Sequence, residues 1–420
     1  MKTQSNSTFI CFLAYIIIMI NERVFAELFA ESERQKKSVG LGTQKTRFLF
    51  EKVAKDSGEM TGICGLRGTG KTTLLLQIAA KKKDSFYVNA EELVFRQTSL
   101  FDFSEHAKAK GFSNLFIDEV HSVPDWPLQL KLAFDRGNCR IWFSGSSSIR
   151  VQEQGADLSR RARLHYLPPL SFREYLWFKH NIELPIIGFD ELLDIKKRKE
   201  ATSSLAPYAQ KFYDYARFGS LPACLNHSEA DALELYRRIV ERIMRSDLAS
   251  VGKIDSGYIE TAYKLANTIA LSSPNEVNYS SLSKQLRRNA YVVDEVLRCL
   301  RMVGIVNAVP PFKSGASAVR KEYKLLLAPP FRYVLATTLG QSFEQVIGGI
   351  REDIFVANTY MKNPRYVKTE RERKTPDYEI DGFTFELGSH KYKHDTDYYV
   401  RDELVTDEKT IPLQLFCMLY

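Results

Sequence analysis

The sequence predicts an α/β protein in which a parallel β-sheet is covered by helices on both faces, followed by a helical region and a small C-terminal α/β domain. Three observations support this prediction. Short apolar runs alternate with longer helix-like stretches over residues 46–178. A glycine-rich turn joins the first apolar run to the first helical stretch. After residue 178 the pattern is mostly helical, and short strand-like runs return after residue 336. Such alternation is typical of parallel sheets.

The glycine-rich turn is the most informative segment. Residues 65–72, GLRGTGKT, fit the phosphate-binding pattern G-x-x-x-x-G-K-[ST], and the apolar run 60–64 and the helical stretch 73–80 give the context that this pattern requires. The loop amides and the helix N-terminus would point at the phosphates. We predict that ATP is bound by Gly65, Leu66, Arg67, Gly68, Thr69, Gly70, Lys71, Thr72 and Thr73. Lys71 would reach the β- and γ-phosphates, and Thr72 would ligate Mg²⁺.

Four further apolar runs complete the predicted sheet, namely residues 86–89, 114–117, 139–143 and 163–167. The second of them ends in Asp118 and Glu119, the Walker B pattern of an apolar strand closed by two carboxylates. Asp118 would hold Mg²⁺, and Glu119 would be the catalytic residue that polarises the attacking water. The alternative is a strand that simply ends in a charged loop.

Two candidate catalytic groups follow. In nucleotide hydrolases with an extra strand between the two Walker strands, a polar sensor ends that strand, and Ser146, with Ser147 beside it, has this place after residues 139–143. The alternative is a serine-rich turn. Arg160 and Arg161 come next. An arginine finger is worth roughly 10³–10⁵ in rate, so Arg161 is a candidate; if it acts in trans, a homo-oligomer is required. The alternative is a solvated charge pair.

Length and composition indicate an ordinary globular protein of several domains. The chain has 420 residues, more than one typical core, with 44% hydrophobic and 26% charged residues. The net charge of +8 permits contact with nucleic acid without requiring it. The six cysteines are scattered without a C-x-x-C pair, which argues against a zinc site or a disulfide framework and favours a reduced, cytoplasmic protein.

The N-terminal segment, residues 1–45, has an uncertain role. Residues 9–20 form an apolar run that is too short to span a bilayer readily. Its flanks fit a signal peptide in part, but residues 21–23 interrupt the expected cleavage region. Because a nucleotide-dependent enzyme needs ATP, we expect a cytoplasmic protein with no stable membrane span; an export signal or an anchor is the alternative.

The region after the predicted ATPase domain (46–178) divides into a helical subdomain (179–265) and a winged-helix-like module (266–335). In the module, two helix-like stretches joined by a short turn precede a strand-like run that starts at Gly304. Arg287 and Arg288 lie between the two helices and could contact DNA phosphates. Such modules also contact proteins or cover nucleotides, so DNA and an unidentified protein are both candidate partners.

Five motifs together resemble a family. They are GLRGTGKT at 65–72, DEVH at 118–121, GSS at 145–147, ADLSRR at 156–161 and LSFRE at 170–174. In this order they resemble the widespread prokaryotic AAA-type ATPases known as predicted ATPases or ATP-binding proteins, which are similar to archaeal and STAND-type ATPases. The resemblance is specific over residues 60–175 and weaker beyond residue 200. It implies a winged-helix module after the ATPase domain and a restriction-endonuclease-like domain of the PD-(D/E)XK type at residues 336–420.

In the C-terminal domain the resemblance implies a degenerate nuclease. The matching positions are Glu344, Asp377 and Glu386, but Gly388 stands where a lysine is expected to position water. Lys391 or Lys393 could substitute from a neighbouring turn. A basic stretch at 368–374 is partly neutralised by glutamates. We expect little or no DNA cleavage.

The expected function is therefore an ATP-binding, Mg²⁺-dependent ATP-hydrolysing molecular switch. The alternative from another class is a DNA-binding regulator or a nuclease that the ATPase gates. A nucleotide-bound scaffold without hydrolysis is a third reading, and the paired carboxylates Asp118 and Glu119 argue against it.

Overall fold

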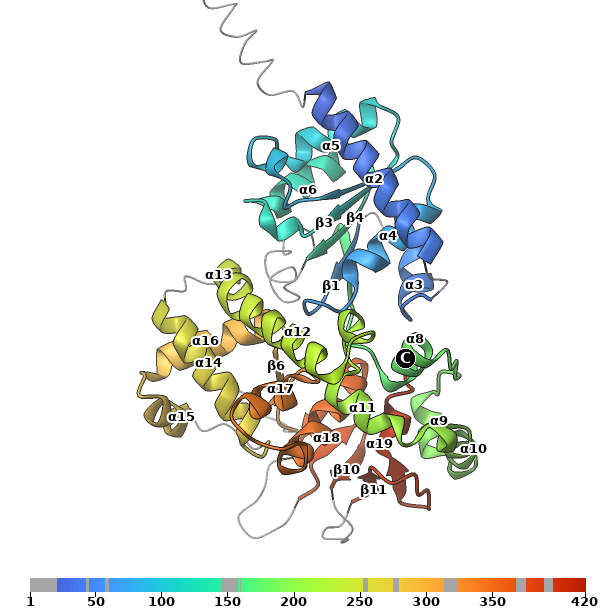
Figure 1. Ribbon diagram of the computed structural model, residues 1–420, viewed down its shortest axis with the longest axis vertical. Coiled ribbons are helices and arrows are strands. Elements are labelled where there is room, and N and C mark those ends of the chain that lie inside the picture. Colours follow the sequence, from blue (N-terminus) through green and yellow to red (C-terminus); the bar gives the residue numbers. More distant parts are fainter. Residues whose placement is uncertain are drawn as a thin grey trace, which may run out of the picture. The chain divides into compact units, whose positions relative to one another are not determined.

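The computed structural model describes residues 21–42, 45–56, 60–145, 158, 160–251, 256–274, 279–312, 323–367, 375–388 and 396–420 (Figure 1). These residues fall into two compact units. The first lies within residues 1–65 and 70–167, and the second comprises residues 66–69 and 168–420. Each unit contains a five-stranded sheet.

The sheet of the first unit is entirely parallel. Its strands are β1 (Met60–Cys64), β2 (Ser85–Asn89), β3 (Asn114–Asp118), β4 (Arg140–Gly145) and β5 (Ala162–Tyr166), in the order β2-β3-β4-β1-β5. All five predicted strands are confirmed. The extra strand is present as well, because β4 lies between β1 and β3.

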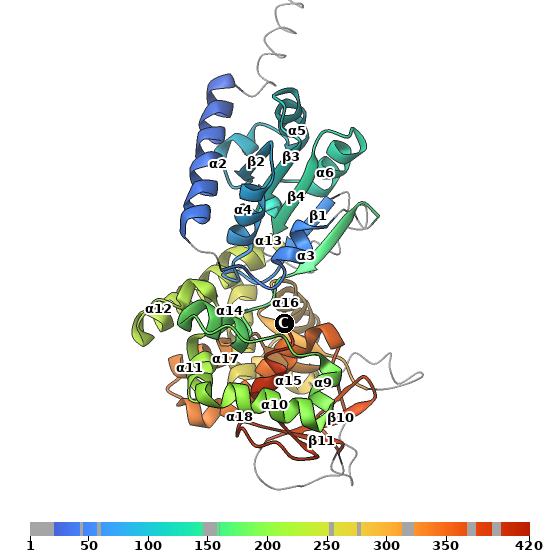
Figure 2. The ribbon, with the colours of Figure 1, turned by 90° about the vertical axis from the view of Figure 1, so that its right-hand side faces the viewer.

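Helices cover both faces of this sheet, as predicted. They are α3 (Phe50–Ala54), α4 (Lys71–Lys81), α5 (Leu100–Ala109) and α6 (Trp126–Asp135). Successive strand residues point to opposite faces. Phe116 and Trp142 pack in a core with α3 and α4, whereas Leu115, Ile117 and Phe143 pack in a core with α5 and α6. Figure 2 shows the sheet between α4 and α6.

A long helix lies along the outer edge of this sheet. It is α2 (Glu22–Gly42), formed within the segment whose role the sequence leaves open. Phe25 of α2 packs against Phe86, and Ser32 Oγ accepts a hydrogen bond from the backbone nitrogen of Tyr87 at 2.9 Å. Since β2 is one of the two edge strands and exposed strand edges invite pairing with other chains, α2 protects this edge.

The second unit begins as a succession of helices. They are α8 (Phe172–His180), α9 (Phe189–Leu193), α10 (Ile195–Leu205), α11 (Lys211–Phe218), α12 (Glu229–Arg242), α13 (Leu248–Val251), α14 (Ser256–Leu271), α15 (Tyr279–Leu286) and α16 (Ala290–Met302). The first of them starts with a capping box, in which Ser171 and Glu174 satisfy each other's backbone donors. An antiparallel pair of strands, β6 (Val306–Val309) and β7 (Lys324–Leu327), follows α16.

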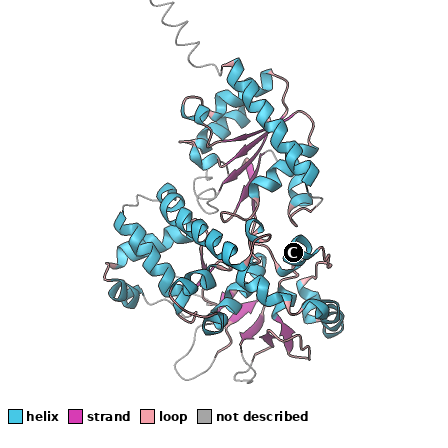
Figure 3. Ribbon diagram, in the orientation of Figure 1, coloured by secondary structure: helices cyan, strands magenta, loops and turns pink. Residues whose placement is uncertain are grey.

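The chain ends in a small mixed sheet with helices. After α17 (Phe331–Thr338) and α18 (Phe343–Thr359), the strands are β8 (Arg365–Tyr366), β9 (Tyr378–Ile380), β10 (Phe383–Leu387), β11 (Tyr398–Arg401) and β12 (Thr410–Pro412), before α19 (Leu413–Phe416). They lie in chain order; β8 to β10 pair antiparallel, and β10 to β12 pair parallel. The strands are drawn in magenta in Figure 3. The predicted C-terminal α/β domain is thus present.

Two further expectations concern the whole chain. None of the described cysteines forms a disulfide, and burial raises the pKa of Cys139, Cys224 and Cys299 to about 11, which keeps these thiols protonated. Within the described ranges, no helix combines the length and the apolarity that crossing a bilayer demands. The apolar run 9–20 lies outside these ranges.

Candidate nucleotide site

The glycine-rich turn joins the carboxyl end of β1 to α4. Gly68 and Gly70 have φ of 85° and 92°, a conformation that suits glycine and lets the chain turn tightly. Lys71, the first residue of α4, is 5% exposed and donates a hydrogen bond from Nζ to the carbonyl oxygen of Gly65 at 3.1 Å. Thr72 follows on the exposed side of the same helical turn. The lysine, the hydroxyl and the helix N-terminus therefore lie together at the predicted phosphate loop.

Residues 66–69 of this turn group with the second unit. Within that unit, Arg67 donates two hydrogen bonds to the carboxylate of Asp247, from Nη2 at 2.9 Å and from Nε at 3.1 Å. Asp247 ends a single π-helical turn (Ile243–Asp247), a rare feature that is frequent at functional sites. A bidentate, charge-assisted contact of this kind fixes the orientation of the guanidinium relative to the carboxylate.

Asp118, the last residue of β3, is almost completely buried. Both of its carboxylate oxygens accept hydrogen bonds from neighbouring strands: Tyr87 Oη donates to Oδ2 at 3.0 Å, and Ser144 Oγ donates to Oδ1. Burial, and then the charge of Asp118, raise the pKa of Tyr87 far above its ordinary value, so this phenol remains a donor. The carboxylate is therefore held in one orientation.

Glu119 follows with an unusual backbone. Its φ and ψ are 52° and 44°, in the left-handed region, which costs a residue other than glycine about 1–3 kcal/mol. Its Oε2 atom lies 3.3 Å from Nδ1 of His121, and both side chains are largely buried. Strain of this kind persists only where the surroundings impose it, and it often marks functional sites.

The strand register brings these groups to one edge of the sheet. In the parallel pairs, Cys64 lies opposite Gly145, and Ile117 lies opposite Phe143. The glycine-rich turn after β1, the carboxylates at the end of β3 and Ser144 near the end of β4 therefore share the carboxyl edge. This edge is where parallel α/β sheets bind ligands.

The other predicted site residues have different outcomes. Ser146 and Ser147 lie outside the described residues, and Ser144 is the serine of β4 that reaches Asp118. Arg161 precedes β5, and its carbonyl accepts a hydrogen bond from Met60, the first residue of β1. Arg161 thus lies at the amino edge of the sheet. The length of β1, about 13 Å, separates this edge from the start of the phosphate loop. The guanidinium of Arg161 is paired with Asp135 at 2.8 Å.

Sequence reasoning assigned no role to three contacts of this site. Tyr87 is missed because its contact with Asp118 depends on strand pairing. The pairing of β2 with β3 sets Tyr87 opposite Phe116 and brings its hydroxyl to Asp118. Ser144 is missed because it lies within β4, whereas the prediction named the serines that follow this strand. His121 lies within the DEVH motif, where its place two residues after Glu119 was the available signal.

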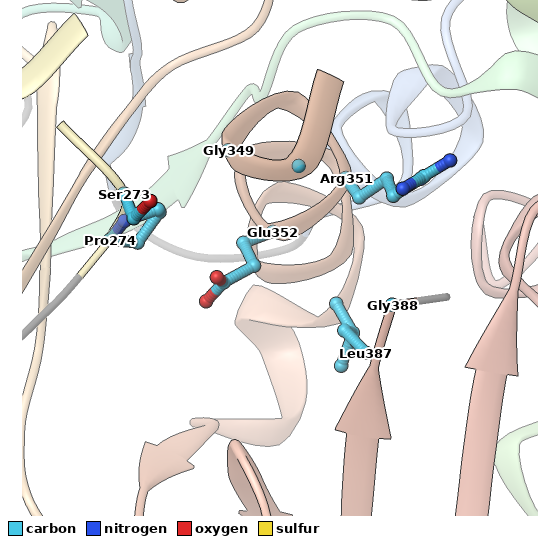
Figure 4. A pocket seen from close by; sticks show the side chains of 8 residues that line it. Ser273, Pro274, Gly349, Arg351, Glu352, Leu387 and Gly388 are labelled. Carbon is cyan, nitrogen blue, oxygen red and sulfur yellow. The ribbon is translucent and has the colours of Figure 1, made fainter. Parts of the chain in front are cut away.

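A second polar cluster lies in the C-terminal part of the second unit. Lys324 Nζ of β7 lies 2.5 Å from Glu352 Oε2 of α18 and 3.5 Å from Asp377 Oδ1, and Tyr378 donates a hydrogen bond to Glu352 at 2.6 Å. Burial lowers the pKa of Lys324, but the charges of Glu352 and Asp377 outweigh it and hold this pKa above its ordinary value. Burial, followed by the charge of Asp377, raises the pKa of Glu386 to about 7. A cavity of about 140 Å³ lies beside Glu352 (Figure 4).

The carboxylates named from the sequence have different surroundings in this part of the chain. Glu344 lies in the first turn of α18 with a 74% exposed side chain, 4.0 Å from Arg217. Glu352 lies about two turns further along α18, and it shares the Lys324 ammonium with Asp377. Gly388 has a φ of 133°, which residues with a side chain rarely adopt, so a lysine does not suit this position. Lys391, Lys393 and the stretch 368–374 lie outside the described residues.

Comparisons with known proteins identify the chain. Residues 57–176 match the family AAA_14, an AAA domain, and residues 209–334 match a domain of unknown function, DUF8612. Uncharacterized protein MJ1637 of Methanocaldococcus jannaschii is 30% identical over 354 residues, which cover 76% of this chain and 73% of that protein. The chain belongs to this family of AAA-type ATPases.

Other members and structures are more distant. Uncharacterized protein MJ1544 of the same archaeon is 28% identical over 233 residues, covering 54% of this chain and 49% of its own. The solved Walker-type ATPase PABY2304 of Pyrococcus abyssi is 13% identical with a TM-score of 0.44, covering 74% of this chain and 95% of its own. AMPPCP-bound DnaA of Aquifex aeolicus is 14% identical with a TM-score of 0.23, and the match covers 60% of this chain and 84% of the DnaA chain.

Proposed function

We propose that this AAA-type ATPase binds ATP and hydrolyses it in a Mg²⁺-dependent reaction, and so acts as a molecular switch. The observation that carries the proposal is the meeting of three groups at one sheet edge: the phosphate loop after β1, the carboxylate pair after β3 and the polar end of β4. Phosphoryl transfer depends mostly on positioning and charge stabilisation, and these groups supply both.

Lys71 is the main side-chain cation for the phosphates. Its ammonium is nearly buried and is held against the loop carbonyl of Gly65. A nucleotide in the loop would offer this ammonium β- and γ-phosphate oxygens, which are stronger acceptors than a carbonyl oxygen. The residues of the loop would wrap the same phosphates through their backbone amides.

Thr72 and Asp118 suit a magnesium ion. A hydroxyl and a carboxylate are the hard oxygen ligands that Mg²⁺ prefers, and it is usually held by one or two protein groups together with substrate phosphates and water. The described residues contain no group of three or more His, Cys, Asp or Glu side chains arranged for a metal, which such a site does not need. When bound, Mg²⁺ neutralises the charge that develops on the phosphates.

Glu119 is the proposed base, and Ser144 and Ser146 are the candidate sensors. Asp118 is already oriented by Tyr87 and Ser144, so the carboxylate next to it is the one available for the attacking water. Because Arg161 lies at the opposite edge of the sheet, we assign its predicted role to an action on a second copy of the chain. ATP, and a second copy, are therefore the proposed partners.

The C-terminal domain fits a metal-dependent nuclease poorly. Lys324 contacts both Glu352 and Asp377, so one ammonium already neutralises the carboxylates that a divalent cation would need. We therefore propose that the domain retains a restriction-endonuclease-like fold without cleavage, and that the DNA-directed alternative is the weaker one.

The proposed function is tested by calorimetry of ATP binding and by phosphate release, with wild type and Lys71→Ala. We expect wild type to bind ATP and release phosphate, and the variant to do neither. Lys83→Ala is the matched control, because Lys83 is an exposed lysine in the turn after α4. Equal ATP affinity in wild type and Lys71→Ala would contradict the proposal.

A further inference from the structure

His121 contacts the proposed base from two residues further along the chain. It is the central residue of a 3-10 turn (Val120–Ser122) that begins directly after Glu119. The atoms Nδ1 and Oε2 lie 3.3 Å apart, and the two side chains are 9% and 13% exposed. This is an ion-pair distance without the alignment of a hydrogen bond. The contact falls on the carboxylate that would act on water, not on the carboxylate of Asp118.

The framework of this contact is local. Val120, between the two residues, is fully buried. Backbone hydrogen bonds from Ser122 to Glu119 at 3.0 Å and from Val123 to Val120 at 3.1 Å close the turn. The left-handed backbone of Glu119 redirects the chain at the start of this turn. Both partners of the contact therefore belong to one closed turn.

Asp118 does not need His121, since its two oxygens are already served by Tyr87 and Ser144. We propose that His121 is a positioning residue for ATP hydrolysis, whose ring holds Oε2 of Glu119 so that the carboxylate keeps one orientation toward the attacking water. This inference rests on the proposed function, because it requires Glu119 to act as the base. Orientation matters here, since a small misplacement of a catalytic group can cost a large factor in rate.

The test compares two variants in steady-state and single-turnover ATP hydrolysis. His121→Leu removes the contact and should lower kcat roughly 10- to 100-fold, with KM and the affinity for a fluorescent ATP analogue little changed. His121→Asn keeps a nitrogen near the position of Nδ1 and should recover most of the lost rate. In a Glu119→Gln background, His121→Leu should cause no further loss, because residues that act through one another are not additive.

His106→Leu is the matched control. His106 is also a largely buried histidine, 3.8 Å from Glu22, but it lies on α5, which carries none of the candidate site residues. This control should keep the wild-type kcat. Thermal unfolding of each variant shows whether the fold is kept, and His121→Asn preserves the test if His121→Leu unfolds.

The outcomes separate this inference from the proposed function. If wild type does not hydrolyse ATP, or if Glu119→Gln hydrolyses it normally, the proposed function fails. If wild type hydrolyses ATP through Glu119 but His121→Leu has an unchanged or raised kcat, the inference alone is overturned. Equal losses from His121→Leu in the wild-type and Glu119→Gln backgrounds would also overturn it, because the histidine would then act independently of Glu119.

Discussion

Lys324 and Glu352 form a buried ion pair that links β7 to α18. Their charged atoms lie 2.5 Å apart, and the side chains are 7% and 14% exposed. Asp377 and Tyr378 extend the pair into a network, in which the tyrosine hydroxyl donates to the glutamate. Inside a protein, such a network is stable only while its charges remain balanced, since a buried unpaired charge is costly. We therefore expect the stability of this region to depend on pH.

The pH dependence can be predicted from Glu386, next to this network. Burial, followed by the charge of Asp377, raises its pKa from an ordinary 4.5 to about 7. The folded protein therefore binds this proton more tightly than the unfolded chain does. The contribution to stability is fully present below about pH 4.5 and is lost as the pH rises to about 7.

This prediction is measured by thermal unfolding of wild type and Glu386→Gln between pH 4.5 and pH 8. Since other groups titrate too, the informative quantity is the difference in Tm between the two proteins. The Tm of wild type, measured relative to that of Glu386→Gln, should fall as the pH rises across that window. Glu344→Gln is the control, because Glu344 is an exposed glutamate at the start of α18. Parallel curves for wild type and Glu386→Gln would contradict the assignment.

The contacts of this network could not be predicted from the sequence, whereas the strands and the phosphate loop could. The strands and the phosphate loop were predictable because apolar periodicity and loop glycines act over a few residues. Lys324 and Glu352 come together only through the tertiary packing of β7 on α18, so no local pattern reveals the pair. The sequence analysis named Glu344, which lies on the same helix about two turns before Glu352.

The nucleotide site follows the same division. The positions of Lys71, Asp118 and Glu119 at the ends of elements were predictable because each lies within a motif that ends or begins an element. Tyr87 was not, since its contact with Asp118 depends on which strand lies beside β3. Arg161 was placed near the site by its position in the chain, but β5 runs parallel to β1, which sets a residue before β5 at the amino edge.

Glu119 and Asp118 should separate into a chemical and a binding role. Glu119→Gln should keep ATP and Mg²⁺ binding while lowering turnover about 10²- to 10⁴-fold, because the amide keeps the shape but cannot accept the proton of the water. Asp118→Asn should instead weaken the part of ATP binding that depends on Mg²⁺. Calorimetry with Mg²⁺ and with EDTA, together with phosphate release, distinguishes the two.

The choice of asparagine for Asp118 follows from the structure. Tyr87 and Ser144 both donate to this carboxylate, so alanine would leave two buried hydroxyls without their acceptor, at about 1–3 kcal/mol each. Wild-type turnover by Glu119→Gln would place the base elsewhere in the site.

Arg161 should affect hydrolysis without affecting ATP affinity. Arg161→Ala is expected to lower the single-turnover rate about 10³-fold or more, as for an arginine that stabilises transition-state charge. Arg160→Ala should have little effect. Since Arg161 lies at the amino edge of its own sheet, mixing Arg161→Ala protein with Lys71→Ala protein should restore part of the activity by action in trans. Unchanged rates in both single variants would show that neither arginine acts in hydrolysis.

The C-terminal domain should be folded but should not cleave DNA. Lys324 contacts both Glu352 and Asp377 and so occupies the position between the carboxylates that a divalent cation would have to take, and Gly388 has a backbone that does not suit a lysine. Full-length protein incubated with plasmid and linear DNA, in Mg²⁺ or Mn²⁺ and with or without ATP, should therefore leave the DNA intact. Any cleavage has to be compared with Asp377→Ala and with Lys391→Ala, which tests the one lysine that follows β10 closely in the sequence. Cleavage by wild type that both substitutions abolish would show that the domain is an active nuclease and would place the DNA-directed function first.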